Sequence, residues 1–197
     1  MKRSIEFFFD FGSPATYLAW TQIQTLADRC NADIQWRPML LGGVFKATGN
    51  QSPAMIPAKG AYMISDLGRY ADRYGVEMNF NPHFPVNTLM LMRGAVAYQN
   101  GERFHQYLSA VFTALWVDEK NLNEPEVMAE VLTAAGFDGD EFMRLCASDA
   151  VKTTLKANTE EAVDRGVFGA PSLFVDGELF FGQDRLEFVE AALRAKS

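Results

Sequence analysis

The chain has 197 residues, 48% hydrophobic and 22% charged, so it is long enough to bury a substantial core and too apolar to be disordered. Its net charge of −7 argues against broad nucleic-acid binding, which needs a basic surface, but leaves room for a local basic pocket. The two cysteines and two histidines form no C-x-x-C or zinc pattern, so we expect neither a disulfide framework nor a metal site.

The beginning of the chain predicts a strand, a helix and a second strand. Residues 5–10 form a short, Phe-rich run that indicates a buried strand. Pro14 opens a helix that we expect to end near Asn31, and residues 34–38 predict the next strand. Connections this short imply a right-handed parallel unit.

The middle of the chain, residues 42–165, shows helical patterns only. One helix is expected from Asn87 to near Gly101, and another covers residues 104–115. A third opens at Pro125 and stops at Gly136, and two more follow around residues 142–145 and 151–163. Residues 41–57 are rich in Gly, Asn and Pro and predict a long surface loop, a kind of segment that is often functional.

The end of the chain predicts a hairpin and a last helix. Asp176-Gly177 separates two short apolar runs, which is a strong hairpin signal, and Leu186 begins a helical pattern. The fold class is therefore α/β, with β-α-β and β-β-α units interrupted by an all-helical insertion. We expect one discontinuous domain, residues 1–41 with 166–197, and an inserted helical domain, residues 42–165.

Ser13 is the first candidate for chemistry. It stands between a strand and a helix, directly before Pro14, so the simplest interpretation is a helix N-cap. The same position suits a second role, because the start of a helix stabilises an anion and a hydroxyl can donate to a thiolate or an oxyanion. A general base that would make Ser13 a nucleophile is not evident in the sequence.

Other candidates are weaker on their own. Pro171 is either an ordinary strand-opening proline or a cis residue that leaves the Ala170 backbone free to pair with an extended ligand. Gln183 and Asp184 start the last helix, where they either cap it or hold a ligand's carboxylate and ammonium groups. Asn50 and Lys59 lie in or beside the expected loop, where an isolated polar or charged side chain is usually solvated.

Four sets of residues, spread along nearly the whole chain, carry a resemblance to a known family: 9–14 with 17–19, 49–51 with 57–60, 84–88, and 167–171 with 181–186. In these segments the chain resembles the thioredoxin fold with a helical insertion. More closely, it is similar to the 2-hydroxychromene-2-carboxylate isomerase and kappa-class glutathione transferase family.

The resemblance implies a glutathione site. It assigns Ser13 to the glutathione sulfur and the Ala170 backbone, before a cis Pro171, to the cysteinyl unit. It assigns Gln183 and Asp184 to the γ-glutamyl end. Asn50 and Lys59 are assigned to the loop side of the same site.

The missing cysteine pair then becomes informative. Disulfide oxidoreductases of this fold place a redox Cys pair where this chain has residues 13–16, Ser-Pro-Ala-Thr. A hydroxyl cannot undergo thiol–disulfide exchange, so the sulfur has to arrive with the ligand. A helix start lowers the pKa of a thiol from about 8.5 and favours its thiolate form.

The resemblance implies a glutathione-dependent isomerase in aromatic catabolism, of the kind found in naphthalene degradation. Its substrate would be a 2-hydroxychromene-2-carboxylate-type compound, opened to trans-o-hydroxybenzylidenepyruvate through a glutathione thiolate stabilised by Ser13. Three alternatives stay open: a kappa-class-like transferase that conjugates electrophiles, a redox-inactive peptide-binding module, and, least favoured, a redox enzyme that uses Cys30.

We expect no signal peptide in the N-terminal residues, because Glu6 interrupts an apolar run that is already short. No apolar stretch approaches the ~20 residues of a membrane helix. We therefore expect a cytoplasmic protein that binds a small aromatic substrate and neither nucleic acid nor membrane. Related proteins are commonly dimers, so the resemblance also implies a homodimer.

Overall fold

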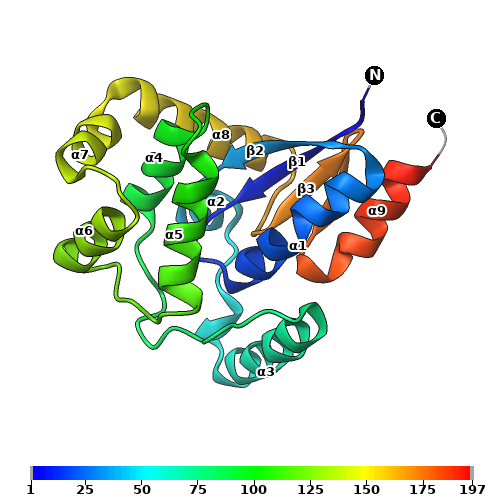
Figure 1. Cartoon of the computed structure of the whole chain (residues 1–197). Coiled ribbons are helices and arrows are strands. Elements are labelled where there is room, and N and C mark those ends of the chain that lie inside the picture. Colours follow the sequence, from blue (N-terminus) through cyan, green and yellow to red (C-terminus); the bar gives the residue numbers. More distant parts are fainter. Residues whose placement is uncertain (1, 196–197) are drawn as a thin grey trace.

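The computed structural model describes residues 2–195. The chain forms a four-stranded sheet with helices packed around it (Figure 1). The strand order is β2-β1-β3-β4, with β1 parallel to β2 and antiparallel to β3, and with β3 antiparallel to β4. The strands are β1 (Ser4–Phe9), β2 (Asp33–Pro38), β3 (Ser172–Val175) and β4 (Glu178–Phe181). The predicted parallel pair and hairpin are confirmed.

The predicted helices occur in the predicted order around this sheet, together with one over residues 57–74 for which the sequence predicts no separate helix. They are α1 (Pro14–Cys30), α2 (Leu41–Thr48), α3 (Pro57–Tyr74), α4 (Leu89–Tyr98), α5 (Phe104–Trp116), α6 (Pro125–Ala134), α7 (Gly139–Ala147), α8 (Asp149–Asp164) and α9 (Leu186–Arg194), with short 3-10 turns η1 (Pro53–Met55) and η2 (Gln183–Arg185). Within the described part of the chain, no helix combines the length and apolar character needed to cross a membrane.

The long loop predicted over residues 41–57 is wrong for much of its length. Residues 41–48 form α2 and residues 53–55 form η1, directly before α3. Gly42 and Gly43 weaken the helical signal of this segment. The segment nevertheless folds as a helix because Val44 is buried in the core and the Leu41 N–H donates to the Asp10 carboxylate, at 2.7 Å.

Both faces of the sheet are covered. Ile5, Phe7 and Phe9 alternate along β1 and belong to the core that contains residues of α1, α5 and α9. Phe8 points to the opposite face and packs with Val44 of α2 and residues of α8. Because both faces are covered, β1 ends in three consecutive phenylalanines, residues 7–9, rather than alternating apolar and polar side chains.

The core joins strand and helical segments. The rings of Phe9 and Phe112 have centroids 6.5 Å apart, and those of Phe11 and Tyr107 are 5.9 Å apart, so α5 packs directly on the end of β1. In Figure 1, α4 to α7 gather at one end of the sheet, while α3 lies apart from them. The division into residues 1–41 with 166–197 and an inserted domain 42–165 stays a prediction.

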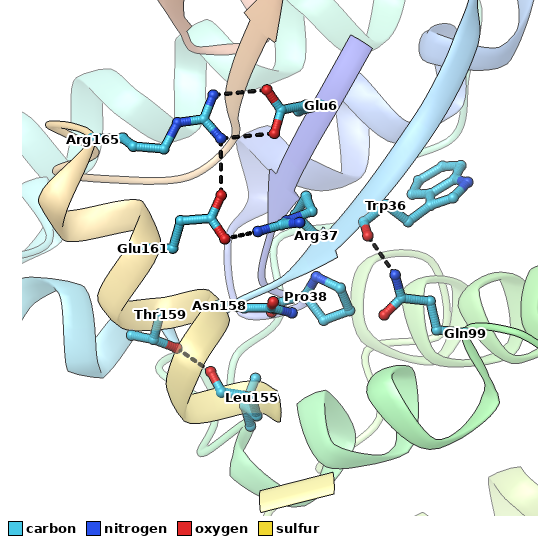
Figure 2. Close-up of polar contacts among 10 residues, drawn as sticks. All are labelled: Glu6, Trp36, Arg37, Pro38, Gln99, Leu155, Asn158, Thr159, Glu161 and Arg165. Carbon is cyan, nitrogen blue, oxygen red and sulfur yellow. Dashed lines mark hydrogen bonds and ion pairs between the residues drawn. The ribbon is translucent and has the colours of Figure 1, made fainter. Parts of the chain in front are cut away.

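Charged side chains attach α8 to the sheet (Figure 2). Arg165, just after α8, donates to both carboxylate oxygens of Glu6 on β1, each at 2.7 Å, and also to Glu161 at 3.0 Å. Glu161 also pairs with Arg37 of β2. The Arg165 guanidinium lies 3.9 Å from the centroid of the Phe174 ring, so the network covers apolar surface as well.

We expect Glu6→Gln to destabilise the protein near neutral pH by about 1 kcal/mol, a value discounted because these side chains remain partly exposed. The Arg165 hydrogen bonds lower the pKa of Glu6, and burial opposes them. Its contribution is therefore fully present above the ordinary glutamate pKa and is lost as the pH falls through the lower folded value. Denaturant titrations of the parent and of Glu6→Gln from about pH 7 to about pH 3 measure the difference in their free energy of unfolding.

The control for this prediction is Glu160→Gln, which removes a mostly exposed carboxylate paired with Lys156 on the same helix. It should change stability little at any pH, because exposed pairs contribute little. The prediction would be contradicted if the stability difference between the parent and Glu6→Gln did not decrease in acid.

Candidate functional site

A cavity of about 800 Å³ lies at the end of β1, and we call it the sheet-end cavity. Its walls come from segments that are distant in sequence and are mostly apolar. They include residues of the β1–α1 loop, α2, α3 and the loops before α4 and β3, among them Asp10, Ser13, Phe45, Asn50, Lys59, Tyr62, Asp66, Phe84, Thr88, Phe168, Ala170, Phe181 and Gln183.

Ser13 lies in this wall and is buried. It is the N-cap of α1, with Pro14 at the first helical position, and its Oγ accepts a hydrogen bond from the Thr16 N–H at 3.2 Å. The cap interpretation is thus confirmed. The same hydroxyl donates to the Ala170 carbonyl at 2.8 Å, so it already makes a donor bond across the cavity wall.

The Ala170 carbonyl that accepts from Ser13 belongs to the Ala170–Pro171 peptide bond, which is cis. The Pro171 carbonyl accepts from the Gly182 N–H at 3.0 Å, which ties the loop to β4. Among the described residues, the Ala170 N–H has no hydrogen-bond acceptor. An extended ligand with a carbonyl oxygen could therefore bind this N–H group.

Asn50 and Lys59 also line the cavity, and both are exposed. The Asn50 side chain donates to the Phe168 carbonyl at 2.8 Å and so connects the segment after α2 to the loop before β3. Lys59 lies in the first turn of α3. It is the one lysine or arginine among the cavity residues that the structure describes, so it supplies the local positive charge of this otherwise acidic protein.

Gln183 and Asp184 differ in their access to this cavity. Gln183 is buried in the cavity wall, and its carbonyl accepts from the Tyr74 hydroxyl at 2.7 Å. Asp184 lies outside that wall, in a smaller hollow of about 160 Å³ that also includes Gln183, and pairs with Arg185. Of the predicted site residues, Ser13, Asn50, Lys59, Ala170 and Gln183 meet in the sheet-end cavity, while Pro171, which follows Ala170, does not line it.

The sequence analysis missed several wall residues. Asp10 is the most notable, because it is a buried carboxyl group next to the loop that carries Ser13. Phe168 and Phe181 form a ring pair with centroids 4.6 Å apart and remain partly exposed. All three residues fall inside segments that carry the family resemblance, but nothing local in the sequence shows that the two phenylalanines meet.

The cysteines stand apart from this chemistry. Neither Cys30 nor Cys146 lines the cavity, and both are free thiols. Burial raises the pKa of Cys146 to about 12, which keeps it protonated and unreactive.

The fold and this site define a thioredoxin-like domain that has a serine at the helix start where redox members have a cysteine. The sequence model of the DSBA-like thioredoxin domain family matches residues 4–194. The chain belongs to this family.

Two groups of curated enzymes are similar to the chain along its length. A 2-hydroxychromene-2-carboxylate isomerase from Sphingobium xenophagum is 33% identical, with 98% of this chain and 99% of the relative covered. The glutathione S-transferase kappa 1 of Homo sapiens is 29% identical, with 100% of this chain and 93% of the relative covered. The relatives are thus isomerases and glutathione transferases.

Solved structures agree with these sequence relatives. A 2-hydroxychromene-2-carboxylate isomerase superposes with a TM-score of 0.84 at 29% identity, covering 96% of this chain and 94% of that one. A probable DsbA oxidoreductase from Streptomyces coelicolor reaches a TM-score of 0.73 at 20% identity, over 97% of this chain and 88% of that one. The second likeness concerns the fold alone.

Proposed function

We propose that the chain is a glutathione-dependent isomerase of the 2-hydroxychromene-2-carboxylate type. The observation that carries this proposal is the position of Ser13: its hydroxyl caps α1 and reaches the carbonyl before cis Pro171 inside the sheet-end cavity. A serine there provides a hydrogen-bond donor and no redox sulfur, and relatives named as this isomerase match 98% and 96% of the chain.

The residues present fit glutathione. The cavity of about 800 Å³ is within the range of small-molecule sites. The Ala170 N–H, which has no acceptor among the described residues, suits a peptide carbonyl, and Lys59 and Asn50 suit a carboxylate. Gln183 would hold the γ-glutamyl end, with Asp184 behind it. Bound in this way, glutathione supplies a thiolate nucleophile.

The chain's own residues would stabilise the negative charge on the sulfur and position the acceptor. The Ser13 hydroxyl would turn its single proton from the Ala170 carbonyl to the sulfur and so favour the ionised form of the sulfur. The Ala15 N–H at the start of α1 has no partner within the helix and adds the positive end of the helix dipole. The aromatic wall of Phe45, Phe168 and Phe181 would hold the flat body of an acceptor and exclude water.

A kappa-class-like transferase is the second candidate, because such transferases also match the whole chain. Calorimetric titration with glutathione tests the shared part of both proposals, and we expect saturable binding that Ser13→Ala weakens. Turnover of a 2-hydroxychromene-2-carboxylate with a count of free thiols separates the two. Isomerisation leaves the thiol concentration constant, whereas conjugation to an electrophile lowers it.

Preference for unrelated extended peptides over glutathione in the same titration would instead favour a peptide-binding module. Reduction of insulin would favour a redox enzyme. A homodimer in the cytoplasm is a further part of the proposal, and sedimentation velocity of the purified protein tests the dimer.

A further inference from the structure

Asp10 is an acidic side chain in the protein interior that the proposed chemistry does not use. It directly follows β1 and is only 1% exposed. No other aspartate or glutamate is buried among the residues that the structure describes. Because burying a carboxylate is costly, the contacts of this one need an explanation.

Donors from three segments meet at the Asp10 carboxyl group. The Gly12 N–H donates to Oδ1 at 2.9 Å, the Leu41 N–H donates to Oδ2 at 2.7 Å, and the Thr88 side chain also bonds to it. Both carboxyl oxygens thus face backbone groups that can only donate, an arrangement suited to the ionised form. Burial raises the pKa of Asp10, and these hydrogen bonds offset part of that rise.

Two of the contacts are made at helix starts. Leu40, the N-cap of α2, makes no side-chain capping bond, and the N–H at the first position of α2 belongs to Leu41. Thr88 is the N-cap of α4, yet its side chain makes no capping bond within that helix. Asp10 therefore supplies the missing acceptor for α2 and bonds a cap residue of α4.

The same contacts connect different walls of the sheet-end cavity. Gly12 directly precedes Ser13, while Leu41 and Thr88 are themselves cavity residues. The other charged groups in the wall are Lys59 and Asp66 of α3, and neither bonds to Asp10. A displacement of the Asp10 carboxylate would therefore change the distance between Ser13 and the α2 wall.

We propose that Asp10 is a positioning residue whose buried carboxylate holds α2 and α4 against the loop that carries Ser13, and so sets both the geometry and the electrostatic field of the sulfur site. Its catalytic part rests on the proposed function. Its anchoring part concerns the protein alone and is testable without glutathione.

Asp10→Asn is the direct test, because it keeps the side-chain size but removes the charge and turns an NH2 group toward a backbone N–H. We expect hydrogen exchange of the amides in residues 41–48 to become about tenfold faster. We expect kcat/KM to fall about tenfold through the displaced wall. The pKa of the bound glutathione thiol should fall by about one unit, because a nearby negative charge is gone.

A lower kcat/KM together with a lower thiol pKa distinguishes a positioning role from a general loosening of the site. A site that is merely loosened would bind the thiolate less well and so raise the thiol pKa. Asp138→Asn is the matched control: it makes the same chemical change at an aspartate that accepts a backbone N–H at a helix start, but Asp138 caps α7 and lies outside the cavity wall. It should leave exchange in α2 unchanged and alter kcat/KM less than about twofold.

Thr88→Val is a second variant that keeps the charge and removes one donor, so a folding failure of Asp10→Asn would not end the test. We expect parental exchange in α2 and a fall in kcat/KM of about threefold. Parental exchange and kinetics in Asp10→Asn, or a raised thiol pKa, would overturn the proposal. Failure of the parent protein to bind glutathione would refute the proposed function only, since amide exchange still decides the anchoring.

Discussion

Replacing Ser13 by Ala is expected to raise the pKa of bound glutathione's thiol by about one unit and to lower kcat/KM about 100-fold. The hydroxyl is the side-chain donor that α1 offers at its start, and it lies buried in the wall of the sheet-end cavity. Its removal leaves the helix dipole in place, so some preference for the thiolate should survive.

The same substitution also removes a helix cap, which costs about 1 kcal/mol of folding stability. Ser148→Ala controls for that loss, because Ser148 caps α8 through its side chain at a position outside the cavity. Both variants should lose similar stability in denaturant titrations, while only Ser13→Ala should change the thiol pKa. The thiolate absorbance of bound glutathione, followed against pH, measures that pKa; equal values for Ser13→Ala and the parent would disprove the assigned role.

Ser13→Thr tests whether the hydroxyl itself matters. It retains the hydroxyl donor and the cap and adds one methyl group. The thiol pKa should therefore stay close to that of the parent, without most of the rise expected for Ser13→Ala. Activity below that of Ser13→Ala would show that the site tolerates no added volume there, and the pKa measurement would still report the hydrogen bond.

The parts of the fold that were predictable depend on local chemistry. Asp176 and Gly177 adopt φ of 50° and 87°, which an Asp-Gly pair accepts more readily than most residues, so the hairpin is encoded in its own turn. Pro14 fixes the start of α1, and Asn31 ends it in the left-handed conformation. Such signals act within a few residues and are visible in a single sequence.

Helix α2 was not predictable in this way. Its segment contains Gly42 and Gly43, and the acceptor for its first N–H is Asp10, which lies in a different part of the sequence. Tertiary burial of Val44 completes the stabilisation. A helix that relies on a distant carboxylate and on core packing has no local start signal, which explains why the segment resembles a loop in the sequence.

The site shows the same division. The family motif identified Ser13, Asn50, Lys59, Ala170 and Gln183, and the fold brings all five into one wall. It gave no indication that Gln183 would line this cavity while its neighbour Asp184 would line only the smaller hollow. Both residues belong to the 3-10 turn η2, whose tight winding directs successive side chains differently, and Asp184 pairs with the guanidinium of Arg185. Whether a residue faces a cavity depends on such turns, whereas its presence in a motif does not.

Gly94→Ala is expected to destabilise the protein by about 3 kcal/mol, although alanine is normally the better helix former. Gly94 is a buried residue of α4. A methyl group there would overlap the Tyr107 hydroxyl and would lie 2.6 Å from the Phe142 ring. Tyr107 is fully buried and donates to the Leu91 carbonyl at 2.7 Å, so moving its ring away also endangers a hydrogen bond that water cannot replace.

The matched control is Gly68→Ala in α3, where an added methyl group meets no atom within 4 Å. There the helix propensity acts alone, and stability should rise by about 0.5–1 kcal/mol. Thermal unfolding measures both: a chain of this size should shift by roughly 6–12 °C downward for Gly94→Ala and by a few degrees upward for the control. Two upward shifts would mean that α4, α5 and α7 pack less closely around Gly94 than the structure describes, because only a yielding core could accept that methyl group.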